Sequence, residues 1–111
     1  MKPEAVRLFV YGTLLEADVC QWVFGRQPEG KPDVLPGHVK KERSVAGRYP
    51  EVCPTDQPGQ GVSGRCLELS PEDLQRADAY ETALYYRAER TLASGSRAWV
   101  YLAAREQNQT K

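Results

Sequence analysis

The sequence has no long hydrophobic run, because no stretch approaches the roughly 20 apolar residues that a membrane-spanning helix needs. Its first four residues, Met-Lys-Pro-Glu, lack the apolar segment of a signal peptide. It also has no excess of charge, since 15 Lys and Arg residues balance 15 Asp and Glu residues. Proteins that bind nucleic acids or anionic membranes usually carry surplus basic residues. We therefore expect a cytoplasmic protein with no nucleic-acid partner and no membrane partner.

Cysteine and histidine are scarce. The three cysteines, Cys20, Cys53 and Cys66, are odd in number and widely spaced, which favours neither a disulfide framework nor a CxxC metal pair. The single histidine, His38, leaves a catalytic triad or a multi-histidine metal site without its other members. We therefore expect reduced thiols, no metal site, and a surface or pocket-rim position for His38.

The composition is that of one globular domain: 111 residues, of which 41% are hydrophobic and 27% charged. We expect this domain over residues 1–104 and a polar tail over residues 105–111. The apolar spacing predicts a buried strand over residues 6–10 and a helix over residues 14–25 that ends at Gly25.

The second helix has a clear start. Ser70 suits the N-cap and Pro71 the first helical position, and acidic residues follow in the first turn, which predicts a helix over residues 71–83. Trp22 and Trp99 stand in apolar runs and are expected in the core. Further strands are expected over residues 34–44, 62–69, 85–93 and 97–104, with turn chemistry over residues 26–32 and only short regular structure over residues 45–61. Together these elements predict an α+β fold, with a small mixed β-sheet or barrel of about five to six strands and two main helices.

The exit from the first strand runs through Tyr11 and Gly12. This dipeptide forms either a tight turn or a backbone cradle for an anion, in which free N–H groups at the start of a helix face the ligand. Glycine at residue 12 permits the unusual backbone angles and the close approach that such a cradle needs.

Glu81 stands on the apolar side of the second helix. At about 100° per residue it falls within about 20° of Leu74, on the face that should meet the core. Burial raises the pKa of a carboxyl, and the nearby Asp78 would raise it further by repulsion, which suits a general base or acid near neutral pH. The alternative is a structural ion pair, for instance between Glu81 and Arg87.

These two features occur together in a known family. An N-terminal strand leading into Tyr-Gly-Thr-Leu resembles the YGSL/YGTL signature of the gamma-glutamylcyclotransferase-like family. Residues 77–81 (ADAYE), followed by Tyr-Tyr-Arg at 85–87, resemble the family's second signature, roughly Leu-Asp-x-Tyr-Glu-Gly and then Tyr-x-Arg. The intermediate segments at residues 35–38, 49–50, 61–64 and 99–101 agree in order, so that the resemblance covers the chain from Arg7 to about Leu102.

The resemblance implies the family's fold and its reaction, in which a γ-glutamyl amine or peptide cyclises to 5-oxoproline and releases an amine without cofactor or metal. It implies Glu81 as the catalytic acid and base. It also implies substrate contacts from the signature residues, which are Tyr11, Gly12, Thr13, Leu14, Tyr85 and Arg87. Backbone amides are the expected donors of residues 12–14, and Arg87 is expected mainly to form an ion pair.

The chain departs from the family pattern at three positions, with Ala77 for a usual Leu, Thr82 for a frequent Gly, and His38 for an aromatic residue. The competing hypothesis is a binding protein with the same fold and pocket and no turnover. Glu81 favours the enzyme, since a binder of an anionic ligand gains nothing from an inward carboxylate. The expected partner is a small γ-glutamyl compound. The sequence leaves open which amine departs, and it leaves the oligomeric state open as well.

Overall fold

The computed structural model describes residues 5–104, and its central element is β1 (Val6–Val10). β1 pairs antiparallel with β5 (Gly61–Leu69) and parallel with β7 (Arg97–Ala103). Alternate side chains of a strand point to opposite faces of its sheet. Leu8 and Val10 accordingly join one buried apolar cluster, and Phe9 joins the other. The apolar run of residues 8–10 at the end of β1 follows from this position, because both faces of the strand are covered there.

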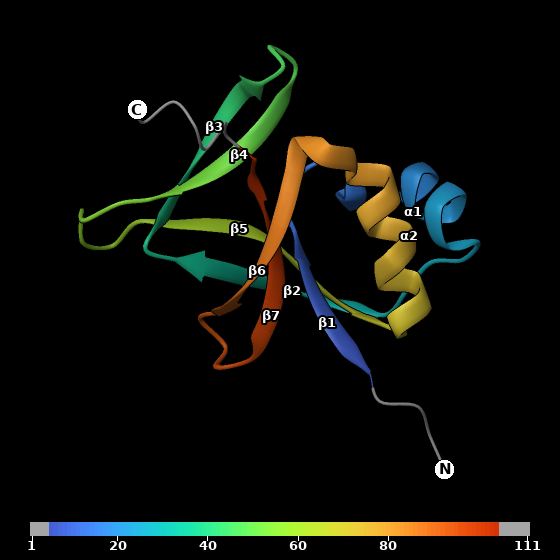
Figure 1. The fold of residues 1–111 in the computed structure, drawn as a ribbon. Coiled ribbons are helices and arrows are strands. Elements are labelled where there is room, and N and C mark those ends of the chain that lie inside the picture. Colours follow the sequence, from blue (N-terminus) through green and yellow to red (C-terminus); the bar gives the residue numbers. More distant parts are fainter. Residues whose placement is uncertain (1–4, 105–111) are drawn as a thin grey trace.

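The strands form two sheets. The larger has the order β2-β5-β1-β7-β6, with β2 (Gly30–Pro36) and β6 (Tyr85–Thr91) at its edges. The smaller pairs β3 (His38–Val45) with β4 (Tyr49–Pro54) in antiparallel fashion. Figure 1 shows β3 and β4 on the other side of the large sheet from the two helices.

The helices α1 (Ala17–Phe24) and α2 (Pro71–Glu81) lie side by side against one face of the large sheet (Figure 1). Their buried residues complete the core cluster that contains Leu8; these residues are Cys20, Phe24, Leu74 and Ala77. α1 ends, as expected, at Gly25, whose φ of 74° is a left-handed conformation that glycine adopts readily.

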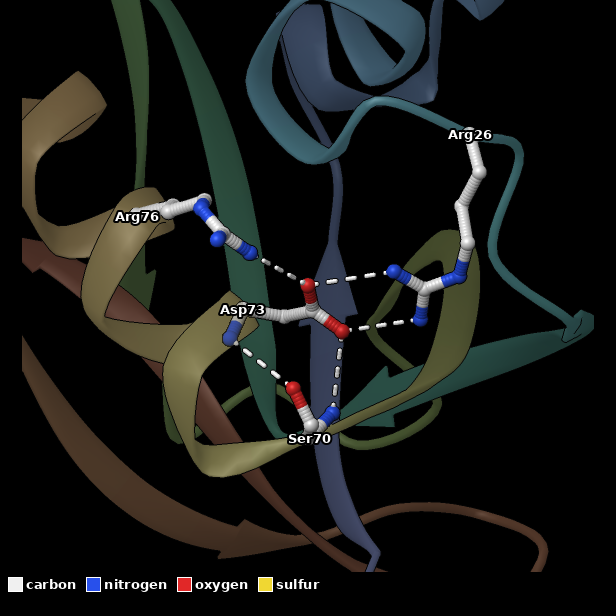
Figure 2. A network of polar contacts seen from close by, with 4 residues as sticks. All are labelled: Arg26, Ser70, Asp73 and Arg76. Atoms are coloured by element: carbon white, nitrogen blue, oxygen red, sulfur yellow. Dashed lines mark hydrogen bonds and ion pairs between the residues drawn. The ribbon is translucent and has the colours of Figure 1, made fainter.

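A buried carboxylate fixes the start of α2 (Figure 2). Asp73 accepts two hydrogen bonds from Arg26, at 2.8 and 3.1 Å, and a third from Arg76 at 3.2 Å. It also accepts a hydrogen bond from the Ser70 N–H, while the Asp73 N–H donates to the Ser70 hydroxyl. The hydrogen bonds from Arg26 hold the pKa of Asp73 at about 2, below its ordinary 3.8. The expected N-cap at Ser70 is thereby confirmed as a reciprocal capping box.

Three sequence expectations about strands need correction. The strand expected over residues 34–44 is two strands of different sheets, separated by Gly37, whose φ is 72°. The segment 26–32, expected as a turn, already contains the start of β2, and β2 accommodates Pro32 and Pro36 because an edge strand has N–H positions that need no partner. The described residues hold seven strands rather than five or six.

Two side-chain placements also differ from expectation. Trp22 is 78% exposed instead of buried. Its ring packs edge to face with the ring of Tyr80, and the two ring centroids are 6.0 Å apart. His38 is buried rather than at the surface, with Nδ1 2.9 Å from the Pro36 carbonyl oxygen. Both errors arise because residues distant in sequence decide what covers a side chain.

The expected tail over residues 105–111 and the first four residues of the expected domain lie outside the described residues. Within residues 5–104, neither helix has the length and apolar character required to cross a membrane.

Replacing the N-cap, Ser70→Ala, is expected to lower the free energy of unfolding by about 1 kcal/mol, because the Asp73 N–H loses its acceptor. Chemical denaturation measures the change. Ser63→Ala is the matched control, since Ser63 is exposed on β5; its effect should stay within about 0.5 kcal/mol. Equal effects of the two substitutions would show that the capping box contributes nothing to stability.

Candidate active site

A pocket opens where β1 ends and the chain turns toward α1. It encloses about 390 Å³ of empty space, counted out to its opening to solvent. The end of β1 and the following turn form one wall, the end of α2 and the start of β6 form another, and β4 closes the pocket. Its lining residues are Phe9, Val10, Tyr11, Gly12, Thr13, Leu14, Tyr49, Pro50, Glu81, Tyr85 and Tyr101.

The turn after β1 presents three backbone donors. Residues Thr13–Leu15 form a 3-10 turn, held by hydrogen bonds from the Leu15 N–H to the Gly12 carbonyl and from the Glu16 N–H to the Thr13 carbonyl. No described residue accepts a hydrogen bond from the N–H of Gly12, Thr13 or Leu14. A concave set of successive free N–H groups is suited to an anion or to a developing oxyanion.

Gly12 is required by a close approach and not by its φ. Its φ is −125°, outside the left-handed region, but its ψ of −133° places it outside the regular helical and extended conformations, as the expectation of unusual backbone angles had it. A Cβ at this position would lie 3.3 Å from Cγ of Pro50, tighter than ordinary van der Waals contact. A side chain at residue 12 would therefore require the Pro50 ring to shift by a few tenths of an ångström, and both residues line the pocket.

Glu81 occupies the last position of α2 and lines the same pocket as the three free amides. Its carboxylate receives no hydrogen bond from any described residue. Burial raises the pKa of Glu81 from its ordinary 4.5 to about 7. A carboxyl with this pKa is present in both protonation states near neutral pH and is suited to accept and return a proton.

The cause of this shift differs in part from the expectation. Burial accounts for it, and repulsion from Asp78 does not contribute. Asp78 is neutralised instead by Arg87, which donates two hydrogen bonds to it at 2.7 and 2.8 Å, and the Tyr101 hydroxyl donates a third at 2.7 Å. The hydrogen bonds from Arg87 hold the pKa of Asp78 below its ordinary value.

The same contacts answer the question of an ion pair between Glu81 and Arg87. Arg87 forms its ion pair with Asp78, and its guanidinium also lies over the ring of Trp99, 4.7 Å from the ring centroid. It does not line the pocket. Arg87, one of the residues expected to contact substrate, is thus outside the pocket lining and joins the end of α2 to β6.

Three of the four tyrosine hydroxyls that belong to pocket-lining residues are engaged within the protein, that of Tyr101 with Asp78. Tyr11 donates to the Tyr101 carbonyl at 2.6 Å, and Tyr85 donates to the Pro50 carbonyl at 2.6 Å. Burial raises the pKa of Tyr11 and raises that of Tyr85 to about 12, so both phenols keep their protons. Their rings shape the pocket, and their hydroxyls join β1 to β7 and β6 to β4.

Five lining residues were not among the expected site residues, namely Phe9, Val10, Tyr49, Pro50 and Tyr101. Phe9 and Val10 end the predicted first strand, and the other three stand in the short segments that matched the family's order, a Tyr-Pro pair in the middle of the chain and a Val-Tyr pair in the last strand. That signal marked these three as part of the pattern. Their place in the pocket depends on the packing of β4 and β7 near the end of β1.

The sequence was also compared with known proteins. The model of the family described as "Gamma-glutamyl cyclotransferase, AIG2-like" matches residues 8–111, which is nearly the whole chain. The chain belongs to this family. A search of curated proteins found no match.

Solved structures share the fold of this cyclotransferase family member at low sequence identity. A protein of Arabidopsis thaliana is 22% identical with a TM-score of 0.80, and the match covers 98% of this chain and 68% of that one. A structure titled gamma-glutamyl cyclotransferase is 16% identical with a TM-score of 0.72, covering 91% and 68%. An AIG2-like protein of mouse is also 16% identical with a TM-score of 0.72, covering 96% and 82%. These similarities establish the α+β fold.

The structure explains one departure from the family pattern. Thr82, where the family often has Gly, has a φ of 64° and ends α2 directly after Glu81. A left-handed φ suits glycine and strains a β-branched residue. At this position the chain therefore has a backbone conformation that glycine adopts most easily, with threonine in place of glycine.

The raised pKa of Glu81 predicts a pH-dependent cost to stability. Burial favours the protonated form of Glu81. The stabilising contribution of this side chain to the free energy of unfolding is therefore fully present below about pH 4.5, declines as the pH rises, and is lost above about pH 7. Glu81→Gln removes this titration. The variant is expected to gain about 2 to 3 kcal/mol of unfolding free energy relative to the wild type between these limits.

Denaturation of both proteins at a series of pH values measures this difference. A difference that stays constant from about pH 4 to about pH 8 would show that the Glu81 carboxyl titrates in the folded protein as it does in the unfolded chain.

Proposed function

We propose that the chain catalyses the cyclisation of a γ-glutamyl amine or peptide to 5-oxoproline, with release of an amine. The observation that carries the proposal is the shared pocket, which is lined both by a carboxyl whose pKa burial raises to about 7 and by three residues with unpaired backbone amides. The family to which the chain belongs supports the same reaction type.

The reaction balances without any added reagent. The free α-amine of the glutamyl group attacks its own γ-carbonyl carbon and forms the C–N bond of a five-membered lactam. The bond from that carbon to the leaving nitrogen breaks, and one proton passes from the attacking nitrogen to the leaving nitrogen. The protein therefore has to hold the substrate folded, stabilise the oxyanion and carry one proton.

The residues of the pocket suit these tasks. Glu81 takes the proton from the attacking nitrogen and returns it to the departing amine, and its raised pKa balances the two transfers. The free N–H groups of residues 12–14 face a negatively charged oxygen, either of the substrate carboxylate or of the developing oxyanion. Both tasks require the fixed geometry that the 3-10 turn and the end of α2 provide.

Glu81→Gln is expected to lower the rate of 5-oxoproline release by about 10²- to 10⁴-fold, because the amide keeps the size of the side chain but accepts no proton at neutral pH. Release of 5-oxoproline from a panel of γ-glutamyl amines and dipeptides measures the effect. Glu72→Gln, an exposed glutamate of the same helix, is the matched control and should keep full activity.

Full activity of Glu81→Gln would exclude Glu81 as the proton carrier. A folded wild-type protein that binds members of the panel without turnover would instead indicate a small-molecule binding protein with this fold.

The pH profile provides an independent test. The attack needs the ionised form of Glu81, so kcat/KM is expected to rise with pH and to reach half of its plateau near pH 7. Initial rates from about pH 5 to about pH 9 measure the profile. A midpoint near the ordinary carboxyl value of 4.5 would assign the titration to a solvated group rather than to Glu81.

A further inference from the structure

A second pocket adjoins the first on its outer side. It shares Thr13, Tyr49, Glu81 and Tyr85 with the inner pocket and encloses about 430 Å³ of empty space out to its opening. Three further residues at the end of α2 and in the 3-10 turn that follows complete its lining, namely Tyr80, Thr82 and Leu84. Because Glu81 lines both pockets, a substrate whose reacting carbonyl lies beside Glu81 can extend from the inner pocket into the outer one.

The walls of the outer pocket present rings and methyl groups more than hydrogen-bonding atoms. Two of the three tyrosine hydroxyls of the lining are engaged within the protein: that of Tyr80 is hydrogen-bonded to the Thr13 hydroxyl at 2.6 Å, and that of Tyr85 donates to β4. Leu84 is 39% exposed, and the highly exposed Trp22 continues the apolar surface beyond Tyr80. Apolar side chains left open to solvent beside a catalytic carboxyl are suited to cover an apolar part of a ligand.

The charge of the outer pocket points in the same direction. None of its lining residues is a Lys, Arg or His, and its only carboxylate is Glu81. The guanidinium of Arg48 lies over the ring of Tyr49, 5.4 Å from the ring centroid, but Arg48 is not part of the lining. A ligand carboxylate placed in this pocket would find no cationic partner among the lining residues and would meet the negative charge of the ionised Glu81. The pocket therefore discriminates against a second carboxylate on the substrate.

We propose that the outer pocket holds the departing amine, and that it selects amines that are apolar or aromatic and carry no carboxylate, with Leu84 as a specificity-determining residue. This inference rests on the proposed cyclisation. It narrows the preferred substrate class to γ-glutamyl amides of apolar amines, and γ-glutamyl dipeptides are expected to be poorer substrates.

A matched pair of substrates tests the proposal. γ-Glutamyl-phenethylamide and γ-glutamylphenylalanine differ only in the carboxylate of the leaving group. The wild type is expected to cyclise the phenethylamide with a kcat/KM at least about tenfold higher. Equal values, or a preference for γ-glutamylphenylalanine, would overturn the proposal.

The chain offers a matched pair of variants as well. Leu84 and Leu15 are similarly exposed, at 39% and 41%, and each ends a 3-10 turn, but only Leu84 lines the outer pocket. Leu84→Arg supplies a cation for the leaving-group carboxylate and should reduce the preference for the phenethylamide about tenfold or more. Leu15→Arg should leave the preference unchanged. Equal shifts in both variants would show a general effect of surface charge and would exclude Leu84 from the subsite.

Binding separates the failure of this inference from that of the proposed function. If the wild type cyclises neither compound, the proposed cyclisation is wrong for these substrates, and calorimetry with the same two compounds still decides the subsite. Tighter binding of the phenethylamide, reduced by Leu84→Arg and not by Leu15→Arg, would support the apolar pocket. Equal binding, tighter binding of γ-glutamylphenylalanine, or no binding of either compound would overturn it.

Discussion

The burial of β1 on both faces is the constraint on which the remaining structure depends. Leu8 and Phe9 have no exposed surface, and each belongs to a different apolar cluster. The helices must cover one face and β4 the other, because an uncovered face would leave these side chains in water at a cost of about 1.5 to 3 kcal/mol each. The chain that leaves β1 consequently emerges between the two layers, where the pocket lies.

The position of Glu81 depends on an ion pair that it does not join. Arg87 and Tyr101 hold Asp78, one turn earlier on α2, and so attach the end of the helix to β6 and β7. With Asp78 neutralised, the arginine leaves Glu81 without a counter-ion, and the Glu81 carboxyl keeps the full effect of burial on its pKa. Of these two acids, which are three residues apart in the sequence, Asp78 thus has a structural role, and Glu81 remains able to exchange a proton with a ligand.

Hydrogen bonds from tyrosine hydroxyls join the pocket's walls to one another. Tyr11 links the end of β1 to β7, and Tyr85 links the start of β6 to Pro50 on β4. Since these two hydroxyls are occupied, the pocket offers backbone amides, aromatic rings, the Tyr49 hydroxyl and one carboxyl to a ligand. That division suits a site in which the substrate brings its own nucleophile and the protein supplies position and proton transfer.

The sequence by itself determined the local elements and the two signatures. A short apolar run marked β1, the serine and proline at residues 70 and 71 marked the start of α2, and the position of Glu81 on the apolar side of that helix marked an inward carboxyl. These features depend on neighbours within a few residues, which a sequence pattern records directly. Only the tertiary structure decided that Arg87 pairs with Asp78, that Trp22 is exposed, that residues 30–36 form an edge strand and that Tyr49 and Pro50 close the pocket. Each of these outcomes depends on contacts between residues far apart in the chain, and the packing energy that selects among such contacts becomes defined only when the whole core has formed.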